Sequence, residues 1–336
     1  MALALRAVGA KAVIGSSGEA IVGTAREVEN EPAVAVWLAC LPGAVVTPFR
    51  LQFERTSEGG TFLGWPDELM GAWPERSTLF LLADPFTFPA DALLERMNED
   101  RAGVPVFGGM ASGAHEPRGN RLIVGEETHA EGAVAALVSG ANIRAAVSQG
   151  CRPIGRPMVI TKAERNVIFE LGGVPAMNKL REVFATLDGA DRQRMQRGLH
   201  IGRVINEYQE RFGRGDFLIR NCLGADPEKG AIAVGDYVRA GQTVQFHVRD
   251  AESADDDLRD VLSTTAAEGP ALAALVFTCN GRGVRLFESP HHDAMAIAKQ
   301  VGEVPTAGFF AQGEIGPIGG RNFLHGFTAS MAIFGE

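Results

Sequence analysis

The sequence predicts an α/β protein of mixed α and β structure, in which two repeated strand-helix-strand-strand halves form mixed sheets with helices on their outer faces. One observation behind this is a repeat: the motif at residues 104–113 recurs 200 positions later, at residues 304–313. A helical pattern also precedes each copy, at residues 89–98 and 290–301. Buried-strand patterns surround both copies in the same order. Repetition on this scale indicates two related structural units.

The first half begins with a fainter echo of the motif at residues 13–19. Short apolar runs bounded by Pro, Gly or Asp are typical of buried strands, and Pro89 suits the first turn of a helix. In chain order we expect strands at residues 32–40 and 45–53, a loop at 59–75, a buried strand at 79–82, the helix at 89–98, a strand at 104–110, and two antiparallel strands at 121–124 and 132–139.

A strand at residues 142–147 leads into a turn-rich crossing at 148–155, and we place a domain boundary just after it. This predicts an N-terminal domain over residues 1–157 and a C-terminal domain over residues 158–336. In the second domain we expect a pair of strands within 158–171, a helix at 175–187, a linker or short helix at 190–198, strands at 201–205, 217–221, 231–234, 243–248 and 272–278, the helix at 290–301, and final strands at 306–310 and 323–334.

Composition excludes several classes of partner. The net charge of the 336 residues is −9, and Lys and Arg are scattered, so no nucleic-acid partner is expected. No apolar run reaches the roughly 18 residues that cross a bilayer, so no membrane partner is expected, and residues 1–12 lack the apolar core of a signal peptide. Cys40, Cys151, Cys222 and Cys279 form no C-x-x-C pair, which favours reduced thiols in a cytoplasmic protein.

No metal or cofactor is expected either. His291, His292 and Asp293 are adjacent, but neighbouring histidines on a helix point in different directions, and no third spaced ligand accompanies them. No phosphate-binding loop, nucleophile elbow or dinucleotide fingerprint occurs in the chain.

Four longer strings carry a resemblance to a known family. Residues 147–155 (VSQGCRPIG) and 159–164 (VITKAE) resemble the end of the FIST N-terminal domain, and residues 277–283 (FTCNGRG) and 308–317 (GFFAQGEIGP) resemble the FIST C-terminal domain. The resemblance implies an intracellular sensory module of signal transduction that binds a small molecule, with amino acids as proposed ligands. It implies no settled reaction.

The chain departs from that family in two respects. It carries no kinase, receptor or F-box segment, so its output is expected to pass through a signalling partner or a homo-oligomer. The strand and helix that usually precede the segment equivalent to residues 11–18 are also expected to be missing from the N-terminal domain. A sheet edge exposed in this way invites pairing with another chain.

The strongest candidate ligand residues follow two predicted strands. Asn280, Gly281, Arg282 and Gly283 form a turn after Cys279, where turn amides and a guanidinium suit a ligand carboxylate. The alternative is an ordinary turn beside an inert buried thiol. Gln312, Gly313 and Glu314 follow the second strand, and Glu314 suits a ligand ammonium group, although plain β-turns explain the same glycines.

A third candidate group lies in the crossing between the predicted domains. Gln149 and Arg152 flank Cys151 there and are candidate ligand contacts, since loops on rigid scaffolds often carry function. The alternative is a purely structural crossing.

Three functions follow from these patterns. The first is a non-catalytic sensor that binds an amino acid or a similar small polar metabolite between its repeated halves. The second is a thiol-dependent hydrolase or transferase that uses Cys279, and the third is a protein-interaction module without a ligand.

Overall fold

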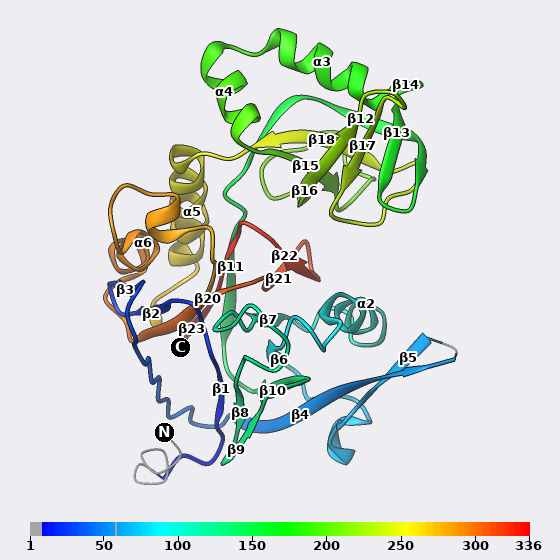
Figure 1. Ribbon diagram of the computed structural model, residues 1–336. Helices are drawn as coiled ribbons and strands as arrows, with labels where there is room; N and C mark the ends of the chain where they lie inside the picture. The colour runs from blue at the N-terminus through cyan, green and yellow to red at the C-terminus, as the bar shows by residue number, and fades with distance from the viewer. Residues whose placement is uncertain (1–8, 58) are drawn as a thin grey trace. The chain divides into compact units, whose positions relative to one another are not determined.

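The computed structural model describes residues 9–57 and 59–336 (Figure 1). Residues 1–8, which belong to the segment where no signal peptide is expected, lie outside the described part. The chain forms two compact units: unit 1 contains the residues up to Val147 together with Leu258–Glu336, and unit 2 contains Ser148–Asp257. In Figure 1, unit 1 carries the blue, cyan, orange and red segments, together with the green segment before Ser148 and the yellow segment after Asp257; the green to yellow segment between them forms unit 2.

Unit 1 is not continuous in the chain, and the division into two successive domains over residues 1–157 and 158–336 stays a prediction. Strands after residue 258 pair with strands from the first 147 residues, so both ends of the chain build unit 1. None of the helices among residues 9–57 and 59–336 is long and apolar enough to cross a membrane.

Unit 1 contains two large mixed sheets. The first has the strand order β22 (Arg321–His325), β21 (Glu314–Ile318), β7 (Val106–Met110), β6 (Ser77–Ala83), β10 (Ala133–Ser139), β4 (Val45–Thr56) and β5 (Gly59–Leu63). The second has the order β11 (Ile143–Ser148), β23 (Ala329–Gly335), β19 (Ala271–Cys279), β20 (Thr306–Ala311), β2 (Ile21–Gly23) and β3 (Arg26–Val28). A small third sheet joins β1 (Ile14–Ser16), β8 (Leu122–Val124) and β9 (Glu127–His129).

The two large sheets pack face to face, and helices cover their outer faces, as the sequence predicts. Phe80 and Phe107 of the first sheet share one core with Phe309 and Phe334 of the second. The far face of the first sheet packs against α2 (Ala90–Asp100). The far face of the second packs against α6 (His292–Val301) and the part of α5 (Ala251–Ala267) from Leu258 onward. This layering is the ordinary solution for amphipathic helices on half-apolar sheets.

The sequence repeat corresponds to a structural repeat. Strands β6 and β7 are parallel and joined through α2, and strands β19 and β20 are parallel and joined through α6. Gly108 in β7 and Gly308 in β20 occupy equivalent places, 200 residues apart. A Cβ atom on Gly108 would overlap the Leu81 carbonyl group, and one on Gly308 would overlap that of Val276. Glycine therefore permits the same close backbone approach in both halves.

Each half also completes the sheet of the other half. The hairpin β2–β3 comes from the first half and pairs antiparallel with β20, where Val22 is opposite Gly308. The hairpin β21–β22 comes from the second half and pairs antiparallel with β7, where Ile315 is opposite Gly108. The exchange makes the two halves a single folded body.

Unit 2 is built on a barrel-like sheet. Its strand order is β12 (Arg152–Glu164), β18 (Thr243–Val248), β15 (Leu199–Val204), β16 (Phe217–Asp226), β17 (Ala231–Val234), β13 (Val167–Leu171) and β14 (Val174–Pro175). Strand β12 pairs with β18 at its start and with β13 at its end, which closes the ring. Apolar side chains such as Ile160, Ile201 and Phe246 fill it. Helices α3 (Ala176–Thr186) and α4 (Gly189–Arg197) complete the unit.

Three local predictions were wrong. Residues 32–40 form no strand: Val34, Val36 and Leu38 are exposed, while the Trp37 ring packs at a tilt against Phe334, with 5.0 Å between the ring centres. Composition showed an apolar run but not that only one side of it packs. Residues 59–63, expected in a loop, form β5 because the long strand β4 offers them a hairpin partner. The strands near residues 122 and 133 do not pair with each other, since β8 joins β1 and β9.

Replacing Gly308 with Ala should destabilise unit 1 by about 3 kcal/mol or more, because the new Cβ lies 2.7 Å from the Val276 carbonyl carbon and the parallel pair must separate. Gly326→Ala is the matched control, since its Cβ meets no atom within 4 Å. Urea denaturation followed by circular dichroism measures both variants. Equal midpoints for the two variants would show that the close approach is not required.

Candidate functional site

The two predicted turns lie side by side at the carboxyl ends of β19 and β20 in unit 1. Cys279 and Ala311 are register partners at the ends of these parallel strands, and the Asn280 amide donates a hydrogen bond to the Ala311 carbonyl at 3.1 Å. The Arg282 amide donates to the Cys279 carbonyl at 2.8 Å and closes the first turn. The structure therefore brings the turn at 279–283 next to the turn at 312–314.

Residues from the first half join this edge of the sheet. The Ser112 hydroxyl donates to the Phe310 carbonyl and accepts a hydrogen bond from the Glu19 amide at 2.9 Å. The Glu19 carboxylate forms an ion pair with Arg285, which follows the turn in the second half. Both copies of the repeat thus contribute to one polar cluster, which we call the strand-end cluster (residues 17–19, 112–113, 279–285 and 312–314).

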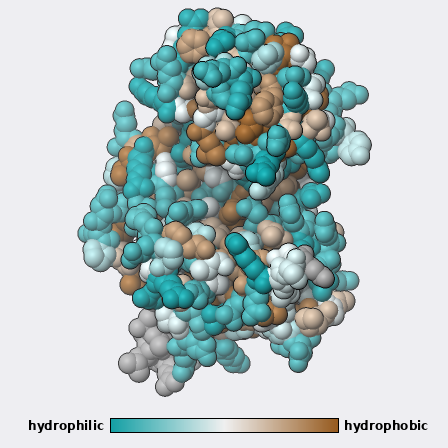
Figure 2. Space-filling model, turned by 45° about the vertical axis from the view of Figure 1, so that its right-hand side comes forward, coloured by the Kyte–Doolittle hydropathy of each residue, from teal (hydrophilic) through white to brown (hydrophobic). Residues whose placement is uncertain are grey.

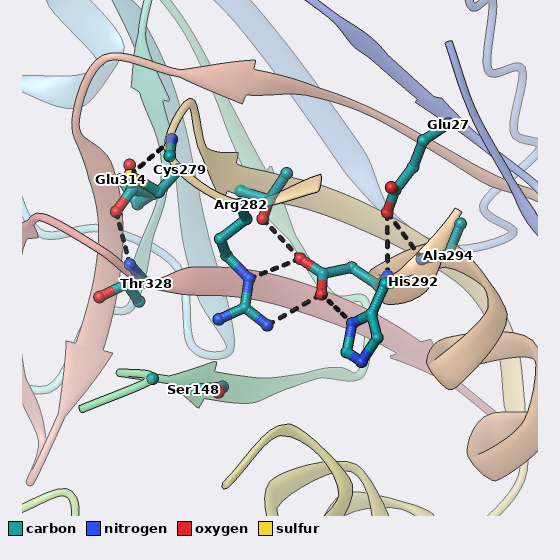
Figure 3. A network of polar contacts seen from close by, with 12 residues as sticks. Glu27, Ser148, Cys279, Arg282, His292, Ala294, Glu314 and Thr328 are labelled. Atoms are coloured by element: carbon teal, nitrogen blue, oxygen red, sulfur yellow. Dashed lines mark hydrogen bonds and ion pairs between the residues drawn. The ribbon is translucent and has the colours of Figure 1, made fainter. Parts of the chain in front are cut away.

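Arg282 is a member of this cluster whose side chain, drawn in Figure 3, is fully buried. Its Nε and one terminal nitrogen donate to the two carboxylate oxygens of Asp293 at 2.7 and 2.8 Å. Its guanidinium carbon lies 5.2 Å from the centre of the Phe287 ring. The guanidinium that was expected to bind a ligand carboxylate therefore binds the carboxylate of Asp293 instead. Through this ion pair Arg282 fixes the turn to the start of α6.

Asp293 remains a carboxylate in this buried place because of its partners. Burial acts to raise the pKa of Asp293, but the Arg282 guanidinium and hydrogen bonds from His292, Arg282 and Thr278 hold that pKa well below its usual range. The Thr278 hydroxyl donates at 2.7 Å. His292 Nδ1 lies 2.9 Å from the same carboxylate, and its ring stacks on Phe287. A buried charge pair of this kind requires such complete hydrogen bonding.

Glu27 is a second buried carboxyl group at the same helix end. It comes from β3 of the exchanged hairpin and accepts hydrogen bonds from the Asp293 and Ala294 amides, both at 3.0 Å. Its own amide donates to His291 Nδ1 at 3.1 Å. Burial, and then the charge of Asp293, raise the pKa of Glu27 to about 8. The side chain thus caps α6 as a neutral acid near pH 7.

Glu314 and Cys279 lie together on the other side of Arg282 from Glu27 (Figure 3). Glu314 is fully buried and accepts a hydrogen bond from the Thr328 amide at 3.0 Å. The Thr328 carbonyl accepts in turn from the Cys279 amide at 2.9 Å. The Gly281 amide points at the Cys279 sulfur, 3.4 Å away, and the thiol is half-buried. Glu314 therefore holds Thr328, just before β23, and the Thr328 carbonyl in turn positions Cys279.

Gln149 and Arg152 belong to unit 2 and bind partners within it. The side-chain Nε2 of Gln149 donates to the Phe217 carbonyl. Arg152 forms an ion pair with Asp191 and lies 3.7 Å from Asp250. Burial acts to raise the pKa of Asp191, but hydrogen bonds from Arg152 and Arg194 outweigh it and lower that pKa. Both predicted contacts thus hold the elements of unit 2 together.

Sequence reasoning missed Glu27 and Arg285, and it noted Glu19 only as a counterpart of the turn at 312–314. Glu19 lies in the faint first copy of the motif, so the repeat itself pointed to it, but nothing local marks Glu27 as a cap for a helix that begins 265 residues later. Asp293 was considered only as a metal ligand. Among residues 9–57 and 59–336, no group of three His, Cys, Asp or Glu side chains has the geometry of a metal site.

Glu27→Gln should make the stability of unit 1 less dependent on pH. The pKa of Glu27 is about 8 in the folded protein and 4.5 in an ordinary setting. Its stabilising contribution to the free energy of unfolding is therefore fully present below pH 4.5 and is lost as pH rises through 8. Gln keeps the acceptor for the helix amides and cannot ionise. The fall in unfolding free energy between pH 5.5 and 8.5 should shrink by roughly 3 kcal/mol, measured by urea denaturation.

Glu95→Gln on the exposed face of α2 serves as the control and should leave the pH profile unchanged. A Glu27→Gln profile that parallels the parent protein would mean that Glu27 is already ionised at neutral pH.

Comparison with known proteins agrees with this architecture. The chain is 46% identical over 325 residues to an uncharacterized protein of Mycobacterium tuberculosis and 45% identical over 325 residues to one of Mycobacterium bovis, which covers 96% of this chain and 83% of each relative. The model of the FIST N domain matches residues 1–174, and that of the FIST C domain matches residues 176–317. FIST domains are associated with small-ligand binding in sensory and signal-transduction proteins. The chain therefore belongs to the FIST family.

Proposed function

We propose that this protein is a sensor that binds an amino acid or a similar small polar metabolite at the strand-end cluster of unit 1. The observation that carries the proposal is the meeting of both repeats at this edge, where an Arg285–Glu19 ion pair joins the two halves. Ligands of α/β proteins commonly bind at the carboxyl ends of strands. A ligand that replaces this ion pair is sensed by both halves at once.

The exposure of the side chains supports a division of labour within the cluster. Gln312 is exposed, the Arg285 side chain is 55% exposed, and Asn280 and Gly281 are half-buried. Arg282 and Glu314, by contrast, are fully buried. The proposal therefore gives the accessible residues the ligand contacts and gives Arg282, Gly283, Gly313 and Glu314 the task of holding the turns in place.

The charges of the accessible residues match an amino acid. The Arg285 guanidinium suits the ligand carboxylate, since it offers a planar set of donors. The Glu19 carboxylate suits the ammonium group. The side chains of Asn280 and Gln312 add uncharged hydrogen-bonding groups. Gln149 and Arg152 receive no ligand contact in this proposal, because their side chains already bind within unit 2.

The signal is proposed to leave through a protein partner or a second copy of the chain. A ligand that binds the turn moves Arg282, whose carboxylate partner Asp293 lies in the first turn of α6. Movement of the turn therefore changes the position of this helix. Two elements that share one buried ion pair move together.

The charge match can be tested directly. Arg285→Met removes the proposed carboxylate contact at an exposed position and should weaken amino-acid binding about tenfold with little effect on folding. Native mass spectrometry of the purified protein identifies a bound metabolite by its mass, and isothermal titration with the identified amino acid measures affinity. Arg181→Met on the exposed surface of α3 is the matched control. Unchanged affinity in Arg285→Met would remove this residue from the site.

A second candidate function is thiol chemistry at Cys279, as in a hydrolase or transferase. The observation in its favour is the Gly281 amide 3.4 Å from the sulfur. Arg285 is also near: its hydrogen bond to Glu19 chiefly raises the pKa of Arg285, and the charge of Cys279 adds a small part. Donors and cations of this kind stabilise a thiolate.

Alkylation rates decide between a nucleophile and an inert thiol, and the chain supplies its own references. Cys40 is exposed, whereas burial raises the pKa of Cys222 to about 12. Iodoacetamide at pH 7, followed by peptide mass spectrometry, should label Cys40 first and Cys279 more slowly if the protein is a sensor. Labelling of Cys279 several times faster than Cys40 would favour the enzyme.

The third possibility, an interaction module without a ligand, has less support. Large apolar patches mark protein-binding surfaces, and on the face shown in Figure 2 the apolar patches are small and interrupted by hydrophilic side chains. Recovery of the apo mass alone, together with no heat of binding for any amino acid, would favour this third function.

A further inference from the structure

We infer that unit 1 has a second binding site, an aromatic pocket beside α2 that takes a small aromatic carboxylate. The pocket lies between β5, the loop that contains the short helix η1 (Asp67–Leu69), and one side of α2. Its volume is about 200 Å³. A dry cavity of about 150 Å³ accommodates benzene, so this pocket has room for one six-membered ring with a short substituent.

Aromatic side chains give the pocket its preference for a ring. Phe62, Trp65 and Trp73 line it, and the two indole rings lie 6.0 Å apart. Trp73 is held in place by a hydrogen bond from Nε1 to the Leu69 carbonyl at 2.8 Å. Aromatic rings that are fixed in this way bind another ring through offset or edge contacts.

Two guanidinium groups line the same pocket and give it a preference for an anion. Arg96 lies 5.3 Å from the Phe62 ring centre and donates to the Gly60 carbonyl at 2.9 Å. Arg101 lies 5.4 Å from the Trp73 ring centre and donates to the Gly71 carbonyl at 3.0 Å. Asp100 also lines the pocket, so the lining carries two positive charges and one negative charge. The excess positive charge favours a monocarboxylate.

One donor in this lining is still unused. The Nε–H of Arg101 is buried and has no hydrogen-bond partner among residues 9–57 and 59–336. A buried donor without an acceptor is costly. Both terminal nitrogens of Arg101 already donate to carbonyl groups, of Asp100 and Gly71, each at 3.0 Å. A ligand carboxylate oxygen is the acceptor that the remaining Nε–H lacks.

The rim of the pocket can adapt to a ligand. Met70 lines the pocket and is 68% exposed, although it is a large apolar side chain. Methionine is flexible and makes favourable contacts with aromatic rings, so it can close over a bound ring. None of the pocket residues belongs to the strand-end cluster, and this inference does not depend on the function proposed for that cluster.

Tryptophan fluorescence provides a direct test, because two of the three tryptophans line the pocket. In a Trp37→Phe background only Trp65 and Trp73 report. Phenylacetate should change their emission saturably, whereas the neutral analogue 2-phenylethanol and the cation 2-phenylethylamine should bind at least about tenfold more weakly. The inference would be overturned if phenylacetate at up to about 10 mM caused no saturable change in tryptophan emission, or if all three compounds bound equally well.

Variants separate this pocket from the other site. Arg101→Met should weaken phenylacetate binding about tenfold, and Arg101→Lys, which keeps the charge but loses the planar fork, should weaken it less. Arg181→Met in α3 and Arg285→Met in the strand-end cluster should both leave it unchanged. Loss of binding in Arg285→Met would assign phenylacetate to the strand-end cluster instead, and unchanged binding in both Arg101 variants would exclude Arg101 as its partner.

Discussion

The exchange of hairpins between the repeated halves holds unit 1 together. Strand β20 needs the hairpin β2–β3 from the start of the chain, and strand β7 needs the hairpin β21–β22 from its end. The parallel pairs that receive these hairpins tolerate only glycine at positions 108 and 308, where neighbouring carbonyl groups approach the backbone. Neither half can therefore bury its sheet alone, and the chain ends must meet before either sheet is complete.

This exchange also determines what the strand-end cluster contains. The first hairpin carries Glu27 to the start of α6, and the turn before it brings Glu19 to Arg285. The second hairpin begins with Glu314, whose buried carboxylate binds the Thr328 amide beside Cys279. The polar edge of unit 1 is thus assembled from segments about 300 residues apart in the chain, which makes it sensitive to the relation between the halves.

Buried charge beneath the cluster gives it a rigid base. Taking a guanidinium and a carboxylate out of water is costly, and the Arg282–Asp293 pair offsets this cost with two direct hydrogen bonds and further ones from Thr278 and His292. The neighbouring Glu27 avoids a second buried negative charge by holding its proton. Such a base positions the accessible residues above it without itself being exposed to a ligand.

The sequence by itself determined the family, the class of fold, the repeat and the outer helices, because hydrophobic period and long motifs are local properties. It also pointed to the turns after Cys279 and Ala311, since parallel neighbours end at one edge. Only the tertiary structure decided which side chains at that edge are accessible. Arg282 is buried because Asp293, 11 residues later, returns to it at the start of α6, and Gln149 and Arg152 bind within unit 2. Partner choice among charged residues depends on packing between distant segments, which no local pattern records.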